Sequence, residues 1–143
     1  MQIERYDPGK PADETTRDAI AGFLEDHLDR FGDPKAHIRK AIDFALDPAR
    51  GGAVIVGRED QGPVGAVVMN RTGMSGYIPE NILVYIAVDR SMRGKGLGKV
   101  LMQAAIEGAD GAIALHVEPD NPAKRLYDAL GFTNKYLEMR LQR

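Results

Sequence analysis

The sequence of 143 residues predicts a single α/β domain, residues 1–143, in which helices cover both faces of one mixed β-sheet. Two observations predict this class. Segments with apolar residues at helical spacing alternate along the chain with short segments that are typical of strands. In addition, every residue from 82 to 88 is apolar, which indicates a central strand buried on both faces. We expect the element order β-α-α-β-β-β-α-β-α-β.

A short strand at residues 1–6 and two helices are expected at the start of the chain. The first helix is expected at residues 15–31, where an apolar stripe at helical spacing follows a capping signal at Thr15. The second helix is expected to begin at Asp33, a favourable N-cap residue, with Pro34 at its first helical position.

The middle of the chain changes to a strand pattern. Residues 53–56 and 64–69 are apolar and flank a turn with glycine and proline, so they predict a β-hairpin. A loop that contains glycine, residues 71–81, then leads into the apolar run 82–88. This run is therefore expected to lie beside the hairpin, in the centre of the sheet.

The last third of the chain predicts a helix, a strand, a helix and a strand. The first helix follows residue 96, and an apolar strand is expected at residues 112–117. The second helix has Asn121 as its cap, Pro122 at its start and Gly131 at its end. Residues 135–141 alternate between polar and apolar side chains, which predicts a strand at or near a sheet edge.

Composition and charge exclude several classes of function. The absence of cysteine removes disulfides, thiolate zinc sites and a cysteine nucleophile. The three histidines show no metal-ligand spacing, so no metal is expected. A net charge of −2 gives no long-range attraction to nucleic acid. Because there is no long apolar run and no signal-peptide pattern, we expect a cytoplasmic protein with neither a nucleic-acid nor a membrane partner.

The residues most suggestive of chemistry follow the central apolar run. Three glycines lie close together, and glycine lets a backbone curl so that several N–H groups face one centre. The start of a helix adds unpaired donors and a partial positive charge, so the segment predicts a site for a phosphate or pyrophosphate. Four basic side chains strengthen this prediction: Arg90, Arg93, Lys95 and Lys99.

Two other phosphate-binding motifs match the sequence of this loop less well. A Walker A loop would need glycine where Arg93 stands and serine or threonine where Val100 stands. A dinucleotide fingerprint would need glycine in place of Lys99. A tight strand-to-helix turn with solvent-facing basic side chains stays open as the structural alternative.

Two motifs resemble the GNAT superfamily of acetyl-CoA-dependent N-acetyltransferases. Residues 93–98, RGKGLG, match the family pattern Arg/Gln-x-x-Gly-x-Gly/Ala between a strand and a helix. Residues 121–132, NPAKRLYDALGF, resemble the second signature of the family, which ends in Leu-Tyr-x-x-x-Gly-Phe. The resemblance covers residues 82–132, about a third of the chain, and it implies a GNAT-like fold and transfer of an acetyl group to a primary amine of a small molecule or protein.

The resemblance also implies a set of contacts with acetyl-CoA. Backbone groups of the strand before the loop would bind the pantetheine arm, the loop amides would hold the pyrophosphate, and Arg93 would shape the loop. Asn121 would face the cofactor, although the family often places asparagine seven residues before the tyrosine, where Asp120 stands here. The positions assigned to the cofactor are Ile86, Ala87, Val88, Arg93, Gly94, Lys95, Gly96, Leu97, Gly98, Lys99 and Asn121.

The chemistry requires an acid and a base. An amine with a pKa of about 10.4 is almost wholly protonated at neutral pH, so a base must remove a proton before attack. The resemblance assigns Tyr127 to the cofactor sulfur, where a hydroxyl that stays protonated at neutral pH can protonate the leaving thiolate. Glu80 and His116 are the candidate bases, each with a structural alternative as a loop carboxylate or a hydrogen-bonded histidine. Weaker candidates are Glu118 and Tyr85.

Two other functions stay open. A non-catalytic acyl-CoA-binding sensor would keep residues 93–98 without a working base, and a nucleotide-binding protein would use the loop for another phosphate. The amine acceptor cannot be read from the sequence, although Met74 and Tyr77 precede the central strand and are candidates for its pocket. Dimerisation is common in the family, so a homodimer is compatible with the sequence, but no surface demands one.

Overall fold

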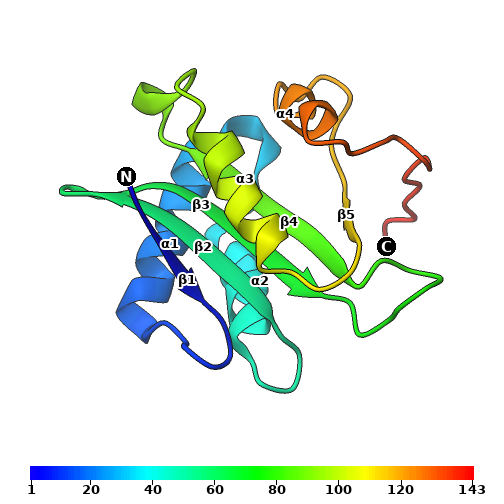
Figure 1. Cartoon of the computed structure of the whole chain (residues 1–143), viewed down its shortest axis with the longest axis horizontal. Coiled ribbons are helices and arrows are strands. Elements are labelled where there is room, and N and C mark those ends of the chain that lie inside the picture. The colour runs from blue at the N-terminus through cyan, green and yellow to red at the C-terminus, as the bar shows by residue number, and fades with distance from the viewer.

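Five strands form one sheet in the order in which they occur along the chain (Figure 1). In this computed structural model, which describes residues 1–143, the first four strands are antiparallel to their neighbours, whereas the fourth and fifth are parallel. The sheet is therefore mixed, as predicted. The strands are β1 (Gln2–Tyr6), β2 (Gly52–Glu59), β3 (Gly62–Arg71), β4 (Asn81–Val88) and β5 (Ile113–Leu115).

Helices cover both faces of the sheet, which confirms the predicted fold class. Helices α1 (Glu14–His27) and α2 (Lys35–Leu46) lie together behind the sheet in Figure 1, and α3 (Leu97–Glu107) crosses its front. The short helix α4 (Lys124–Ala129) lies beyond the end of β5. None of these helices is both long and apolar enough to cross a membrane.

The strand sequences explain why the sheet has two cores. Successive side chains of a strand point to opposite faces, so a strand buried on both faces needs apolar residues at consecutive positions. In β2, Val54 and Val56 belong to the core under α1 and α2, whereas Ala53 and Ile55 belong to the core under α3. This continuous apolar run anchors both layers of helices on the same strand.

A β-bulge interrupts the alternation in β4. Val68 of β3 pairs with Tyr85, and the next residue, Met69, pairs with Leu83, so Val84 is the extra residue of β4. Val84 and Tyr85 both pack on the side of α1 and α2, whereas Leu83 packs on the side of α3. A bulge bends its strand and increases the local twist, so β4 changes direction at Val84.

The helix boundaries differ from the predicted ones near residues 13–35. Helix α1 begins after Asp13, whose carboxylate accepts the Thr16 N–H at 2.8 Å, and it ends at His27. Residues Asp29–Phe31 form a separate 3-10 turn, η1, because Asp29 adopts a positive φ of 56°, which an α-helix cannot continue through. The prediction that Asp33 caps the second helix is wrong, because its carboxylate accepts the Tyr85 hydroxyl instead.

Two boundaries near the C-terminus are also corrected. Strand β5 spans three residues rather than 112–117, and α4 begins at Lys124 rather than at Pro122. Asn121 still supports the turn before α4, because its Oδ1 atom accepts the Ala123 N–H at 2.9 Å. The shorter β5 has a direct effect on the site described below.

The predicted final strand at residues 135–141 is absent. Its three apolar side chains, Leu137, Met139 and Leu141, are 78–90% exposed, and none of its backbone groups pairs with β5. Alternating polar and apolar side chains indicate only that a segment suits an extended conformation. A β-strand also needs backbone hydrogen bonds with a neighbouring strand. The segment follows α4 at the side of the molecule where β5 lies (Figure 1).

Candidate active site

Strands β4 and β5 separate soon after they meet. They pair only where Asn81, Ile82 and Leu83 face residues Ile113–Leu115. Beyond Leu83, β4 continues to Val88 with β3 as its only partner. Five residues of β4 therefore keep one backbone edge without a neighbouring strand, and this edge includes the sequence-predicted positions 86–88.

The bulge in β4 explains why the strands diverge at this point. Val84 is both the extra residue of the bulge and the first residue after the last β4–β5 pair. Since bulges bend a strand and disrupt its ladder, β4 turns away from β5 there. An edge with free N–H and C=O groups can bind an extended ligand as another strand would bind.

The open edge leads into the glycine-rich loop. After the 3-10 turn η2 (Arg90–Met92), Gly94 and Gly96 each have a φ of +80°, a conformation that disfavours other residues. A Cβ at either position would meet nothing within 4 Å, so these glycines serve the backbone conformation rather than packing. Gly96 is the N-cap of α3 and contributes no side-chain cap.

The amides of this loop are free to bind a ligand. No N–H group from Gly94 to Lys99 donates a hydrogen bond to another part of the chain. The last three of these amides lie in the first turn of α3, where helix geometry leaves the donors unpaired. Unpaired amides and the positive end of the helix dipole together favour an anion. The predicted phosphate site therefore has suitable local geometry.

Arg93 connects the loop to three other elements. Its Nε atom donates to the Val88 carbonyl at 3.2 Å, and Nη2 donates to the His27 carbonyl at 2.6 Å. Its Nη1 atom donates to Asp29 at 3.0 Å. The guanidinium thus joins the end of β4, the end of α1 and η1, which accounts for a loop-shaping role.

Only two of the four basic side chains of the loop are free of ion pairs. Arg90 also pairs with Asp29, through an Nε–Oδ1 contact of 2.8 Å, so one carboxylate holds two of the four basic side chains. The two arginines hold the pKa of Asp29 below its usual value, so this carboxylate is ionised at neutral pH. The exposed side chains of Lys95 and Lys99 form no ion pair, so they are the cations left for a ligand.

Tyr127 lies in the core between α4 and α3. Its side chain is 7% exposed, and its ring meets Phe132 edge-on with 5.9 Å between the ring centroids. Burial raises the pKa of Tyr127 to about 12, so the hydroxyl keeps its proton at neutral pH. The hydroxyl donates to no protein group, yet it is not an enclosed polar atom, so it retains access to solvent.

Helix α4 lies against the start of α3. A Cβ built on Gly98 would lie 3.3 Å from Leu126 Cδ2 and 3.8 Å from Val88 Cγ2. This third glycine therefore serves close packing, in contrast to Gly94 and Gly96. The contact places α4, and with it Tyr127, beside the open end of β4 and the glycine-rich loop.

Glu80 has a different environment from the one expected for a base. Its Oε1 atom accepts the Ala112 N–H at 2.8 Å, and Oε2 accepts the Gly76 N–H at 3.2 Å. These backbone hydrogen bonds lower the pKa of Glu80, because they stabilise the ionised form. The carboxylate thus braces the β3–β4 loop against the start of β5, at the paired end of the two strands.

This bracing gives a prediction for pH-dependent stability. Glu80 has a depressed pKa in the folded chain, so its contribution is present above the unfolded-state value of about 4.3 and is lost as pH falls through the folded-state pKa. In Glu80→Gln, the unfolding free energy should fall at pH 7, and less of it should be lost on acidification below pH ~4.3. Urea unfolding of both proteins across this range measures the effect. Equal acid sensitivity would contradict the bracing role.

His116 lies one residue beyond the end of β5. Its side chain is exposed and makes no hydrogen bond within the chain, so the alternative of a hydrogen-bonded structural histidine does not describe it. Glu118, two residues later, is also exposed. His116 therefore stays a predicted base with a free imidazole.

The buried Tyr85 has a partner that the sequence did not predict. Its hydroxyl donates to Asp33 Oδ2 at 2.5 Å, and burial together with this carboxylate raises the pKa of Tyr85. The pair connects β4 to the segment between α1 and α2. Sequence reasoning missed the pair because the two residues are 52 positions apart, and neither belongs to a motif.

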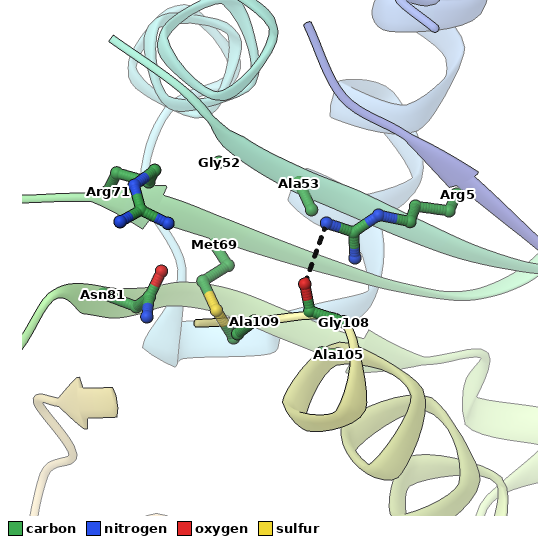
Figure 2. A pocket seen from close by; sticks show the side chains of 9 residues that line it. All are labelled: Arg5, Gly52, Ala53, Met69, Arg71, Asn81, Ala105, Gly108 and Ala109. Atoms are coloured by element: carbon green, nitrogen blue, oxygen red, sulfur yellow. Dashed lines mark hydrogen bonds between the residues drawn. The ribbon is translucent and has the colours of Figure 1, made fainter. Parts of the chain in front are cut away.

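Figure 2 shows a small pocket at the opposite end of β4 and α3. Its rim carries Arg5, which donates to the Gly108 carbonyl, and Arg71, which makes no side-chain hydrogen bond. It is lined by the start of β4 and the end of α3, so it is separate from the glycine-rich loop. No group of three or more histidine or acidic side chains is suitably placed for a metal.

One comparison with known proteins identifies the family of this chain. The family model described as an acetyltransferase (GNAT) domain matches residues 50–134. Among curated proteins, no sequence matches the chain.

Solved structures share the fold at low sequence identity. A transcriptional regulator from Bacillus halodurans C-125 is 19% identical, with a TM-score of 0.71 over 99% of this chain and 100% of that one. An aminoglycoside N-acetyltransferase in complex with CoA is 18% identical, with a TM-score of 0.70 over 99% and 95%. An aminoglycoside 6′-N-acetyltransferase from Acinetobacter haemolyticus is 15% identical, with a TM-score of 0.70 over 100% and 98%.

Proposed function

Because this chain belongs to the GNAT acetyltransferase family, we propose that it is an N-acetyltransferase that transfers the acetyl group of acetyl-CoA directly to a primary amine of a small molecule or protein. The observation that supports this most is the open edge of β4, which leads directly into a loop of unpaired amides. An extended thiol arm with a diphosphate at one end matches this arrangement. Acetyl-CoA has that shape and charge.

The cofactor would lie along β4. The backbone of Ile86, Ala87 and Val88 would pair with the amides of the pantetheine arm, and the N–H groups from Gly94 to Lys99 would hold the pyrophosphate. The side chain of Asn121 uses only its Oδ1 atom within the chain, so its Nδ2 amide group is available to the cofactor.

The transfer needs charge stabilisation at two points. The amine nitrogen forms a bond with the thioester carbonyl carbon, and the carbonyl oxygen becomes an oxyanion, which a free backbone N–H of β4 can stabilise. The carbon–sulfur bond then breaks, and the electron pair goes to the sulfur. In the proposal, Tyr127 donates its proton to this thiolate, since its pKa of about 12 keeps it protonated until the sulfur acquires charge.

The base must take the proton that the amine loses. Glu80 and His116 are the proposed candidates, and the structure supports them unequally. The carboxylate of Glu80 is held by two amides and has a lowered pKa, whereas the imidazole of His116 is exposed and unpaired. Profiles of kcat against pH for Glu80→Gln and His116→Gln would identify the base, because only its loss removes the acidic limb.

Titration with acetyl-CoA, followed by a panel of amines, tests the proposal. We expect acetyl-CoA to bind and thiol release to require an accepted amine. The Lys99→Gln variant should weaken binding severalfold, whereas Lys40→Gln, on the outer face of α2, should not. No binding at millimolar acetyl-CoA would refute the proposal. Binding without turnover on any amine would favour an acyl-CoA sensor, and displacement of CoA by ATP would favour a nucleotide-binding protein.

A further inference from the structure

Asp29 has an unusual backbone conformation at the start of η1, just after the end of α1. It is the only residue other than glycine with a positive φ, 56°, a conformation that costs free energy for a residue with a Cβ. Both of its carboxylate oxygens are in use. Oδ1 accepts Arg90 Nε at 2.8 Å, and Oδ2 accepts Arg93 Nη1 at 3.0 Å.

The two arginines carry this attachment into the phosphate loop. Arg93 also donates to the carbonyls of Val88 and His27, and the Arg90 N–H donates to His27 Nδ1 at 3.2 Å. The residues that begin the loop are thus fixed to the last residues of α1, more than 60 positions earlier. Asp29 is the one acidic residue that pairs with both arginines.

We propose that Asp29 is a positioning residue for the pyrophosphate loop, an inference that rests on the proposed function. It holds Arg90 and Arg93 against the end of α1, so that the glycines which follow are held with their amides unpaired. It also forms ion pairs with these two arginines, so Lys95 and Lys99 are the unpaired cations that meet the diphosphate. Asp29 itself does not touch the ligand.

A different role for Asp29 would have the opposite effect on the affinity for CoA, so the proposal can be tested. If Asp29 only withheld two cations from the site, its removal would free Arg90 and Arg93 for the phosphates, and CoA would bind more tightly. An isolated exposed ion pair usually contributes little, so an unchanged affinity is the second contrary result. Only the positioning role predicts weaker binding of CoA. Without Asp29 the ligand itself has to order the loop, and this ordering reduces the binding free energy.

The test uses Asp29→Asn, since asparagine has the same size and tolerates positive φ. The Kd for CoA, measured by calorimetry, should rise about tenfold, while the melting temperature should change little. Asp26→Asn is the matched control. It removes the same charge three residues earlier, where the carboxylate approaches Arg90 and His27 but does not pair with Arg93. This control should change the Kd less than twofold.

A substrate without the diphosphate separates positioning from a general loss of structure. S-acetylpantetheine contains the thioester and the arm but neither phosphate of the pyrophosphate. Asp29→Asn should lower kcat/KM about tenfold with acetyl-CoA and leave it unchanged with S-acetylpantetheine. An equal loss with both donors, or no loss with either, would overturn the inference. Failure of the wild-type protein to bind CoA would instead overturn the proposed function.

Discussion

Replacement of Tyr127 by phenylalanine is expected to lower kcat about 100-fold and to leave the affinity for acetyl-CoA within about twofold. The ring would keep its place in the core beside Phe132, because only the hydroxyl is removed. Without the hydroxyl, the thiolate would have to leave unprotonated, and the barrier to breaking the carbon–sulfur bond would rise. Steady-state kinetics with saturating amine, together with the Kd for acetyl-CoA, measure the two quantities separately.

Stability provides the control for this variant. The Tyr127 hydroxyl donates no hydrogen bond within the chain, so its removal should leave the melting temperature nearly unchanged. Tyr136→Phe removes the same group from a side chain that is 78% exposed and should have no effect on kcat. If Tyr127→Phe retained full turnover, Tyr127 would be a packing residue and another group would have to protonate the sulfur.

The largest effect on stability is expected at the contact between α3 and the sheet. Leu101 is fully buried, and Leu101→Ala should lower the unfolding free energy by about 2–5 kcal/mol through lost burial and a residual cavity. Its Cδ1 atom lies only 2.4 Å from where a Cβ on Gly65 would stand. Gly65→Ala should therefore also destabilise the protein, because Leu101 must move from a tightly packed position.

A double-mutant cycle tests this contact. In the Leu101→Ala background, Gly65→Ala should cost much less than in the wild type, because the clash is gone and the new methyl group occupies part of the cavity. Gly22→Ala is the control, since a Cβ there meets only the end of Lys35, at 3.8 Å. It should stabilise α1 by about 0.5–1 kcal/mol. Urea unfolding gives all four free energies, and strict additivity would contradict the predicted contact.

The periodicity of the apolar residues predicted most of the fold, because the faces on which a helix or strand is buried determine where its own apolar residues lie. Strand β4 was recognisable from its unbroken apolar run, and α3 from its stripe, since each pattern reports which faces of an element are covered. The predicted strand at residues 135–141 failed for the converse reason. Pairing with β5 depends on a neighbour in space, and no property of the segment itself reports that neighbour.

The site was predictable where it depends on backbone conformation. The sequence predicted a curled backbone at the glycines, and Gly94 and Gly96 provide it through positive φ angles, whereas Gly98 serves packing. Asp29 was missed, because its two partners are more than 60 residues away and pairing across that distance depends on the tertiary fold. The one local signal was its residue type, since aspartate tolerates positive φ better than most residues after a helix.

The three-residue ladder between β4 and β5 makes folding and ligand binding interdependent. The residues after α3 are joined to the sheet by this short ladder, by the packing of α4 and by hydrogen bonds such as the one between Glu80 and Ala112, whereas residues 84–88 of β4 have no strand neighbour on this edge. A ligand that bound both this edge of β4 and the residues after α3 would link the C-terminal quarter of the chain to the rest. At a concentration of 100 times its Kd, such a ligand would raise the unfolding free energy by about 2.7 kcal/mol, so thermal melting would report occupancy directly.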